Sequence, residues 1–327
     1  MAERRDTTRE DPLSDLIHLD SGIASIPDHV EIVPTPEELR QMRIFRALKI
    51  AAAAVVIASV VFGAYGFLRA RSRGGAIAEA LEGGRALAFE RAISLTDDEN
   101  TLGWLDGALS LTRTEAERTG ASAGPHAGDG SLDGKLAGTY AKLLGGDVAA
   151  AFADAEALEL TGDFASEAIF LQSLAAEATG RLEAAVARAS VAHQLRPSSS
   201  RYLARWSTAL TRAGHPDDAL ARLDRANGES PDIALARARA ELAKPGDPTR
   251  ALEAAQRVLA AEDANPAEKS WAYLINALAQ LRGGHREQAS TAIDAARAKM
   301  PVADELFRIR LSEALLALGR ATEAGAA

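Results

Sequence analysis

The residues of this chain that could carry chemistry are its histidines and one Gly-Lys dipeptide. The histidines are His18, His29, His126, His193, His215 and His285. No two of them lie three or four positions apart, so no helix would present a paired metal site. Gly134-Lys135 does not form a phosphate-binding loop, because no glycine stands five residues before Gly134 and Leu136 replaces the required serine or threonine.

Carboxylate pairs are the other candidates for acid-base chemistry. Asp97-Asp98 and Asp217-Asp218 are better explained as residues that start or stop helices than as catalytic pairs. The chain has no cysteine, which excludes a thiol nucleophile, thiolate zinc sites and disulfides. We therefore expect no catalytic residue, no cofactor and no metal ligand; an enzyme with an unrecognised site in residues 76–134 is the least favoured alternative.

The amino-acid composition limits the fold classes and the kinds of partner that we expect. Hydrophobic residues make up 47% and aromatic residues only 5%, which favours closely packed helices rich in Ala and Leu. The net charge is -9 and no basic domain stands out, so we do not expect a nucleic-acid partner.

A recurring spacing organises the second half of the chain. The pattern Gly-x4-Ala-x6-Ala-x4-Pro starts at Gly180, returns 34 residues later at Gly214, and occurs again at Gly284. Glycine permits a tight turn between two helices, and the alanines, seven residues apart, permit close helix approach. The proline would close the second helix. The pattern predicts antiparallel helix pairs.

This 34-residue helix-turn-helix pattern resembles the tetratricopeptide repeat (TPR) family. The resemblance implies an all-α fold in which residues 135–327 form TPR-like repeats stacked into a superhelix. Weaker matches, at Gly145 with Ala150 and Ala157 and at Gly246 with Ala251, extend the array.

Residues 50–68 are an uninterrupted apolar run of 19 residues with no charge. As a helix the run spans roughly 28 Å, close to the hydrocarbon thickness of a bilayer. We expect a juxtamembrane and transmembrane helix over residues 36–73 that ends at Gly74-Gly75. Small residues four apart, such as Ala54 and Ala58, would permit a homodimer, although such spacing arises easily by chance in an Ala-rich segment.

Flanking charges favour one orientation by a thin margin. Four basic residues precede the apolar run and three follow it. The positive-inside rule then places the N-terminus in the cytoplasm and, in a bacterium, the repeats in the periplasm of an inner-membrane protein.

The remaining segments are less regular. We expect residues 1–35 to be a disordered tail, because they show no sustained periodicity and contain several prolines and charges. Residues 76–119 are expected to form a degenerate helical repeat, and residues 120–134 a Gly-rich linker.

In the TPR family, positions 2, 5, 9, 12 and 13 of each repeat face the inner groove. By this resemblance the partner-binding residues are Glu167, Phe170, Leu174, Arg201, Thr208, Arg212, Trp271 and Arg282. Leu278 also falls at a groove position, and for Trp271 and Leu278 packing in the core is slightly favoured over exposure to the groove. The lysine and asparagine clamp for a C-terminal carboxylate is not expected, since Ala204 and Thr208 occupy two of its positions.

These observations predict a membrane-anchored scaffold that binds a protein or peptide in its groove and catalyses nothing. The layout resembles that of bacterial inner-membrane proteins associated with the secretion translocon, which implies a role in envelope protein export or assembly. The alternative is a signalling protein whose cytoplasmic tail, residues 1–35, is the active segment.

Overall fold

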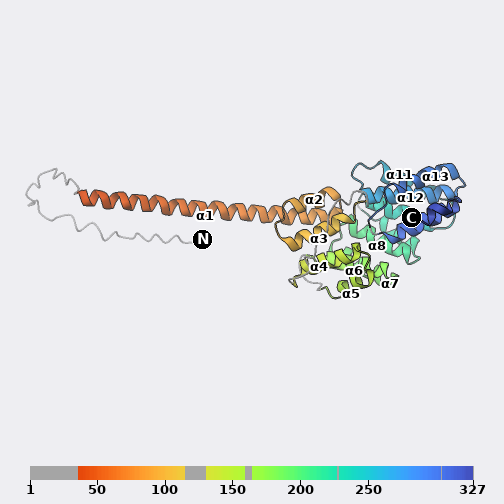
Figure 1. Ribbon diagram of the computed structural model, residues 1–327, viewed down its shortest axis with the longest axis horizontal. Coiled ribbons are helices and arrows are strands. Elements are labelled where there is room, and N and C mark those ends of the chain that lie inside the picture. The colour runs from red at the N-terminus through yellow and green to blue at the C-terminus, as the bar shows by residue number, and fades with distance from the viewer. Residues whose placement is uncertain (1–35, 115–129, 159–163, 227, 303, 327) are drawn as a thin grey trace, which may run out of the picture. The chain divides into compact units, whose positions relative to one another are not determined.

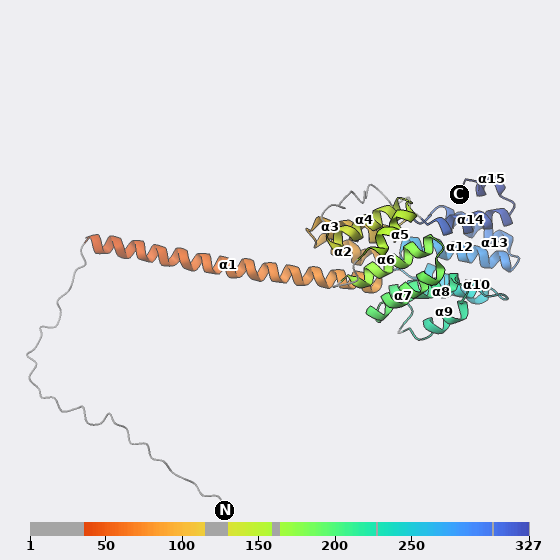
Figure 2. The same cartoon turned by 90° about the horizontal axis from the view of Figure 1, so that it is seen from below.

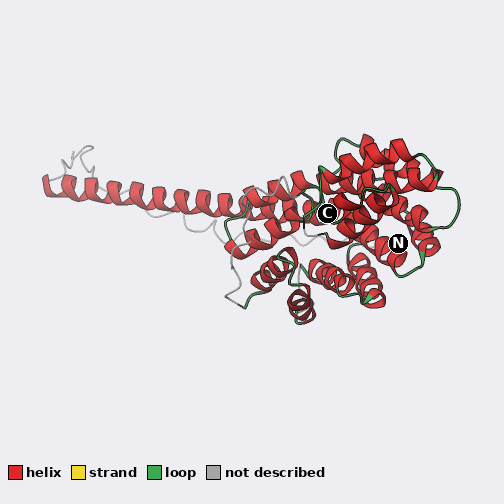
Figure 3. Cartoon of the chain, turned by 45° about the vertical axis from the view of Figure 1, so that its right-hand side comes forward, coloured by secondary structure: helices red, strands yellow, loops and turns green. Residues whose placement is uncertain are grey.

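The computed structural model describes residues 36–114, 130–158, 164–226, 228–302 and 304–326. These residues form helices and loops with no strand (Figure 3), so the prediction of an all-α fold is confirmed. The predicted disordered tail, residues 1–35, and most of the predicted linker lie outside the described residues. The chain divides into two compact units, Met1–Ala64 and Tyr65–Ala327.

The described helices are numbered along the chain, and Figure 1 labels most of them. The first seven are α1 (Pro36–Gly83), α2 (Ala86–Ser94), α3 (Glu99–Ser110), α4 (Leu132–Leu144), α5 (Val148–Glu156), α6 (Ala165–Ala178) and α7 (Leu182–Leu195). The others are α8 (Ser200–Arg212), α9 (Pro216–Leu223), α10 (Pro231–Ala243), α11 (Thr249–Ala260), α12 (Pro266–Arg282), α13 (Arg286–Arg297), α14 (Glu305–Ala317) and α15 (Ala321–Ala324).

From α4 onward the helices form pairs joined by short turns. The pairs are α4–α5, α6–α7, α8–α9, α10–α11, α12–α13 and α14–α15. The first helices of neighbouring pairs also contact each other along the series α4, α6, α8, α10, α12 and α14. Figure 2 shows α8, α9 and α10 beside one another, and α12, α13 and α14 likewise.

Each of these six pairs turns at a glycine with positive φ. The glycines are Gly146, Gly180, Gly214, Gly246, Gly284 and Gly319, with φ between 75° and 109°. A Cβ added to any of them would meet nothing within 4 Å, so backbone conformation, not space, selects glycine at these turns.

The turn between α4 and α5 differs from the sequence-based register. We predicted Gly145 as the turn glycine, but Gly145 is right-handed and Gly146 adopts the left-handed conformation. The buried residues of α5 and its end accordingly include Ala151 and Leu158, not the predicted alanines at positions 150 and 157. Burying Leu158 removes more apolar surface from water than burying an alanine, which explains the shift by one residue.

One proline of the repeat pattern has a different role from the one predicted. Pro231 does not close α9, which ends at Leu223; it occupies the first turn of α10 instead. Proline suits that position because the first helical N–H has no intrahelical partner.

Helix α1 also extends further than predicted. It continues through Gly74-Gly75 and ends at Gly83. Each glycine costs a helix roughly 0.5–1 kcal/mol, but burying Ile77 and Leu81, which are 6% and 0% exposed, contributes about 1.5–3 kcal/mol each. Packing of the residues after the glycines therefore outweighs the local preference to stop.

The segment Ala54–Gly83 of α1 is long and apolar enough to cross a membrane, by length and composition. Large apolar side chains within it are exposed on every side, including Phe62 at 76% and Phe67 at 67%. The last turns of α1 are different, because Ala76, Ile77, Ala80 and Leu81 pack with α2, α3 and α4 in one apolar cluster.

Candidate functional site

A cavity of about 1350 Å³ lies against the first helices of the pairs. Its walls come from α6, α8, α10, α12 and the start of α14. The turn between α1 and α2 and the end of α3 line it as well. The groove expected from the sequence is therefore closed in part by the chain's own residues 83–112.

Most of the predicted partner-binding residues line this cavity. They are Phe170, Leu174, Arg201, Thr208, Arg212, Trp271 and Arg282, together with Leu278. Glu167 does not line it and is fully buried, so this carboxylate cannot contact a partner in the structure. Trp271 is only 7% exposed and belongs to the core cluster, so it both packs in the core and borders the cavity.

Glu167 is the centre of a closed polar cluster. Its carboxylate accepts a hydrogen bond from Nη1 of Arg201 at 2.5 Å and another from Nη2 at 2.9 Å. The hydroxyls of Tyr140 and Tyr202 also donate to it, the latter at 3.0 Å. Burial and the neighbouring carboxylate raise the pKa of both tyrosines well above the ordinary value, so their hydroxyls remain protonated donors.

Arg201 is held from several sides. Its guanidinium carbon lies 3.9 Å from the centroid of the Phe170 ring. On the α1–α2 turn, a Cβ added at Gly84 would stand 2.7 Å from Cδ of Arg201. Burial by itself would lower the pKa of Arg201, but the Glu167 carboxylate raises this pKa above its ordinary value. The side chain is only 11% exposed, so this predicted groove residue is engaged by the protein itself.

A second cluster surrounds Glu177, at the other end of α6. Arg205 Nη1 lies 2.5 Å from one carboxylate oxygen, and Arg212 Nη1 lies 2.6 Å from the other. Arg205 also donates to the hydroxyl and the carbonyl of Ser173 at 2.9 and 2.8 Å. Burial of Glu177 opposes its ionisation, yet these two arginines hold its pKa below the ordinary value.

Arg239 on α10 lies beside this second cluster. Its guanidinium carbon is 4.2 Å from the centroid of the Trp271 ring. The indole N–H of Trp271 donates to Oδ2 of Asp304 at 2.6 Å, and Phe307 packs edge-on against the indole. The Trp271 ring is therefore fixed, and the arginine stacks on a rigid surface.

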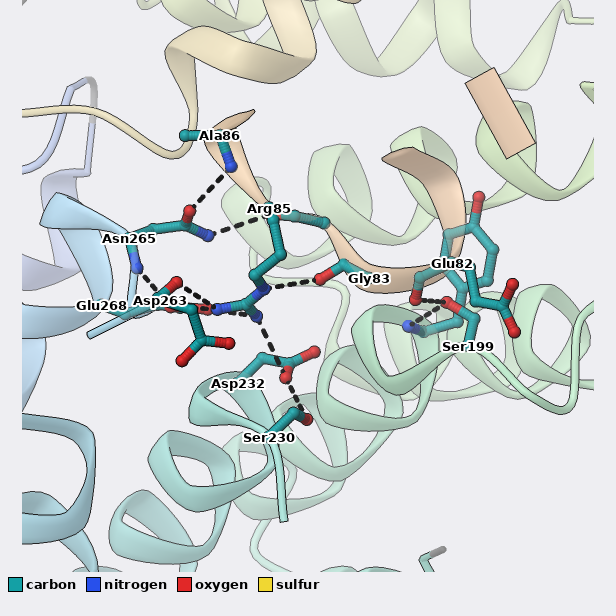
Figure 4. A network of polar contacts seen from close by, with 12 residues as sticks. Glu82, Gly83, Arg85, Ala86, Ser199, Ser230, Asp232, Asp263, Asn265 and Glu268 are labelled. Carbon is teal, nitrogen blue, oxygen red and sulfur yellow. Dashed lines mark hydrogen bonds and ion pairs between the residues drawn. The ribbon is translucent and has the colours of Figure 1, made fainter. Parts of the chain in front are cut away.

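The α1–α2 turn is tied to the array by Arg85 (Figure 4). Nη1 and Nη2 of Arg85 donate to the two carboxylate oxygens of Glu268 at 2.8 and 3.0 Å, and Nη2 lies 3.1 Å from Asp232. Asn265 accepts a hydrogen bond from the Ala86 amide and donates to the carbonyl of Gly84, both at 2.9 Å.

Further hydrogen bonds join the end of α1 and the residues that follow α3 to the later helix pairs. The Ser199 hydroxyl, at the start of α8, lies 3.1 and 2.8 Å from the carbonyls of Leu81 and Glu82 at the end of α1. The Ala267 amide donates to the Thr112 carbonyl at 3.1 Å, and Thr114 forms an isolated bridge with Pro301. The segment predicted as a degenerate repeat thus contacts the late pairs of the array.

The cavity is basic although the whole chain is acidic. Among its lining residues are eight arginines, Arg85, Arg201, Arg205, Arg212, Arg239, Arg282, Arg308 and Arg310. Five carboxylates face them, Glu177, Asp232, Glu268, Asp304 and Glu305, against a net charge of -9 for the full sequence. Packing of the helix pairs against one another concentrates positive charge on this surface.

Sequence reasoning missed several residues of the cavity. Arg205 and Arg239 fall outside the groove positions that the resemblance supplied, and Arg85 lies before the regular repeats. The partner of Arg85, Glu268, is 183 residues away in sequence, so no local spacing signals the pair. In the part of the chain that the structure describes, no group of three or more His, Cys, Asp or Glu side chains could hold a metal ion.

No protein-family model matches this chain, and no curated protein matches it. Apolar walls with fixed guanidinium groups suit recognition of an extended, partly apolar and negatively charged ligand.

Proposed function

We propose that this protein is a single-pass membrane-anchored, TPR-like scaffold that binds a protein or peptide partner in the basic cavity and catalyses no reaction. The observation that carries the proposal is the cavity itself. It is lined by the first helices of consecutive pairs, the surface that TPR-like arrays use for peptides. The repeated left-handed glycine turns support the TPR-like assignment.

The exposed apolar part of α1 supports the membrane anchor. Nine large apolar side chains between Val55 and Leu68 are at least 59% exposed. Surface of this kind is unfavourable in water by about 25 cal/mol per Å², whereas lipid accommodates it. In this proposal residues 50–68 cross the inner membrane, the N-terminus is cytoplasmic and the repeats are periplasmic, where they serve envelope protein export or assembly.

Photo-crosslinking from inside the cavity tests the partner. A photoreactive amino acid would replace Leu174 or Thr208, which line the cavity, in cells that express the full chain. The matched controls are Val191 and Leu195, which are 39% and 51% exposed and do not line the cavity. We expect a discrete adduct from the cavity positions only. The same adduct from all four positions, or none from the cavity, would overturn the proposal.

Reporter fusions test the topology separately. Fusions of alkaline phosphatase and of a cytoplasmic fluorescent protein after residue 326 should give phosphatase activity without fluorescence. The reverse result would place the cavity in the cytoplasm and eliminate the periplasmic part of the proposal, whatever the crosslinking shows.

A further inference from the structure

Arg239 is a cavity arginine that forms no ion pair with the residues that the structure describes. Among the described residues it makes no hydrogen bond or ion pair, and its Nε is buried without a hydrogen-bond partner. By contrast, Arg85, Arg201, Arg205, Arg212 and Arg282 each donate to a carboxylate or a carbonyl of the chain. A half-buried cation without a paired carboxylate is unfavourable unless something else compensates it.

The surroundings of Arg239 retain a positive charge. Together with Arg205 and Arg212 it makes three guanidinium groups, and the nearby carboxylates are Glu177 and Asp304. Both oxygens of Asp304 already accept hydrogen bonds, from the Trp271 indole and the Phe307 amide. One positive charge therefore remains without a partner in this group.

The titration behaviour agrees with the geometry. Burial lowers the pKa of Arg239, and the nearby carboxylates do not fully compensate. For Arg85, burial acts in the same direction, but Glu268 and Asp232 raise the pKa above the ordinary value. The two arginines thus differ in the supply of counter-charge.

Stacking on Trp271 leaves the two Nη groups of Arg239, unlike its buried Nε, available as donors. All N–H groups of a guanidinium lie in its plane, so an indole that covers one face does not block the edge. A carboxylate in that plane can accept two parallel hydrogen bonds. Close by, Leu235, Leu242, Ile275 and Leu278 give the cavity an apolar wall.

We propose that Arg239, supported by Arg212, binds a carboxylate of a peptide whose neighbouring apolar side chains rest against this wall. The proposal rests on the proposed function, because it names the chemistry by which the cavity would recognise its peptide. The carboxylate is either an Asp or Glu side chain or the C-terminal group of the peptide, and the experiment separates these two sources.

Selection from a random peptide library tests which peptide chemistry the cavity prefers. The full chain in detergent micelles would be panned beside the Arg239→Gln variant and the matched control Arg237→Gln. Arg237 lies on the same helix, α10, but does not line the cavity and donates to Asp224 at 2.6 Å. We expect wild type and Arg237→Gln to enrich peptides with a carboxylate next to apolar residues, and Arg239→Gln to lose that enrichment.

Binding of the best peptide then localises the carboxylate. In fluorescence anisotropy, either Glu/Asp→Gln/Asn substitution or C-terminal amidation of the peptide should weaken binding at least tenfold, which identifies the source. The same peptide change should have little further effect on Arg239→Gln. The peptide-side change does not depend on whether a protein variant folds.

The outcomes separate the two proposals. If no peptide is enriched by any form, the proposed function fails. If wild type enriches peptides without a carboxylate, or if Arg239→Gln selects the same peptides as wild type, the cavity binds peptides but the role of Arg239 is wrong.

Discussion

Two carboxylates on α6, the buried Glu167 and the half-buried Glu177, have opposite surroundings. Glu167 accepts from Arg201, Tyr140 and Tyr202, and nothing charged is left over in its cluster. Ten residues later, Glu177 is shared by two arginines, with Arg239 beside them. A closed cluster specifies packing, whereas a cluster with surplus charge is available to a ligand. The contrast separates structural arginines from binding arginines within one cavity.

The largest expected loss of stability comes from removing the charge of Glu167. In Glu167→Gln, the guanidinium of Arg201 stays buried but loses its counter-charge, so we expect the free energy of unfolding to fall by about 3–5 kcal/mol. Urea denaturation of the full chain in micelles, followed by circular dichroism, measures it. The control is Glu156→Gln, whose surface pair with Arg188 should contribute at most about 1 kcal/mol. If both variants lose the same free energy of unfolding, the ion pair between Glu167 and Arg201 contributes no more than a surface pair.

Arg85 should give the next largest effect. Arg85→Gln leaves Glu268 and Asp232 without their cation, and we expect a loss of about 2–3 kcal/mol. Hydrogen exchange of the α1–α2 turn should accelerate at the same time, because this contact joins the turn to α10 and α12. Arg91→Gln is the control, since its ion pair with Glu79 is at the surface. If hydrogen exchange at the turn is unchanged, Arg85 does not hold the turn against α10 and α12.

Glu177→Gln should cost less, about 2 kcal/mol at neutral pH, because Arg205 keeps its bonds to Ser173 and Arg212 is 29% exposed. The effect should depend on pH. The folded pKa of Glu177 lies below the ordinary 4.5, so its contribution is fully present above pH 4.5 and is lost as pH falls through the folded value. Denaturation at several pH values should show the difference from wild type shrinking below pH 4.5. A difference that stays constant below pH 4.5 would contradict this sign.

The smallest expected effect is that of Arg239→Gln on stability. No hydrogen bond or ion pair within the described residues is lost, and removal of a half-buried cation offsets the lost stacking on Trp271. We expect a change within about 0.5 kcal/mol of wild type. Arg201→Gln in the same denaturation assay should be severely destabilising. If the two variants lose equal stability, Arg239 is a structural residue and the contrast between the clusters disappears.

These charge pairings show where sequence reasoning stops. The repeat resemblance placed Arg201 and Arg212 in the groove, and both line the cavity. It could not reveal that Arg201 is neutralised by Glu167, 34 residues earlier, while Arg239 has no such partner among the described residues. Pairing depends on which side chains of stacked repeats meet, and repeat spacing alone does not encode that.

By itself, the sequence determined the features that depend on local backbone geometry. The glycines at 180, 214 and 284 adopt the left-handed turn, and Ala185, Ala219 and Ala289 are fully buried, because a tight turn and close helix packing each require a specific residue type. The tertiary structure decided the rest. The left-handed turn lies at Gly146 and not at Gly145, and α1 continues past Gly74-Gly75. Most cavity arginines donate to groups of the chain, whereas Arg239 has no hydrogen-bond partner among the described residues. Those outcomes follow from burial and from contacts between distant segments, which outweigh local preferences of about 1 kcal/mol.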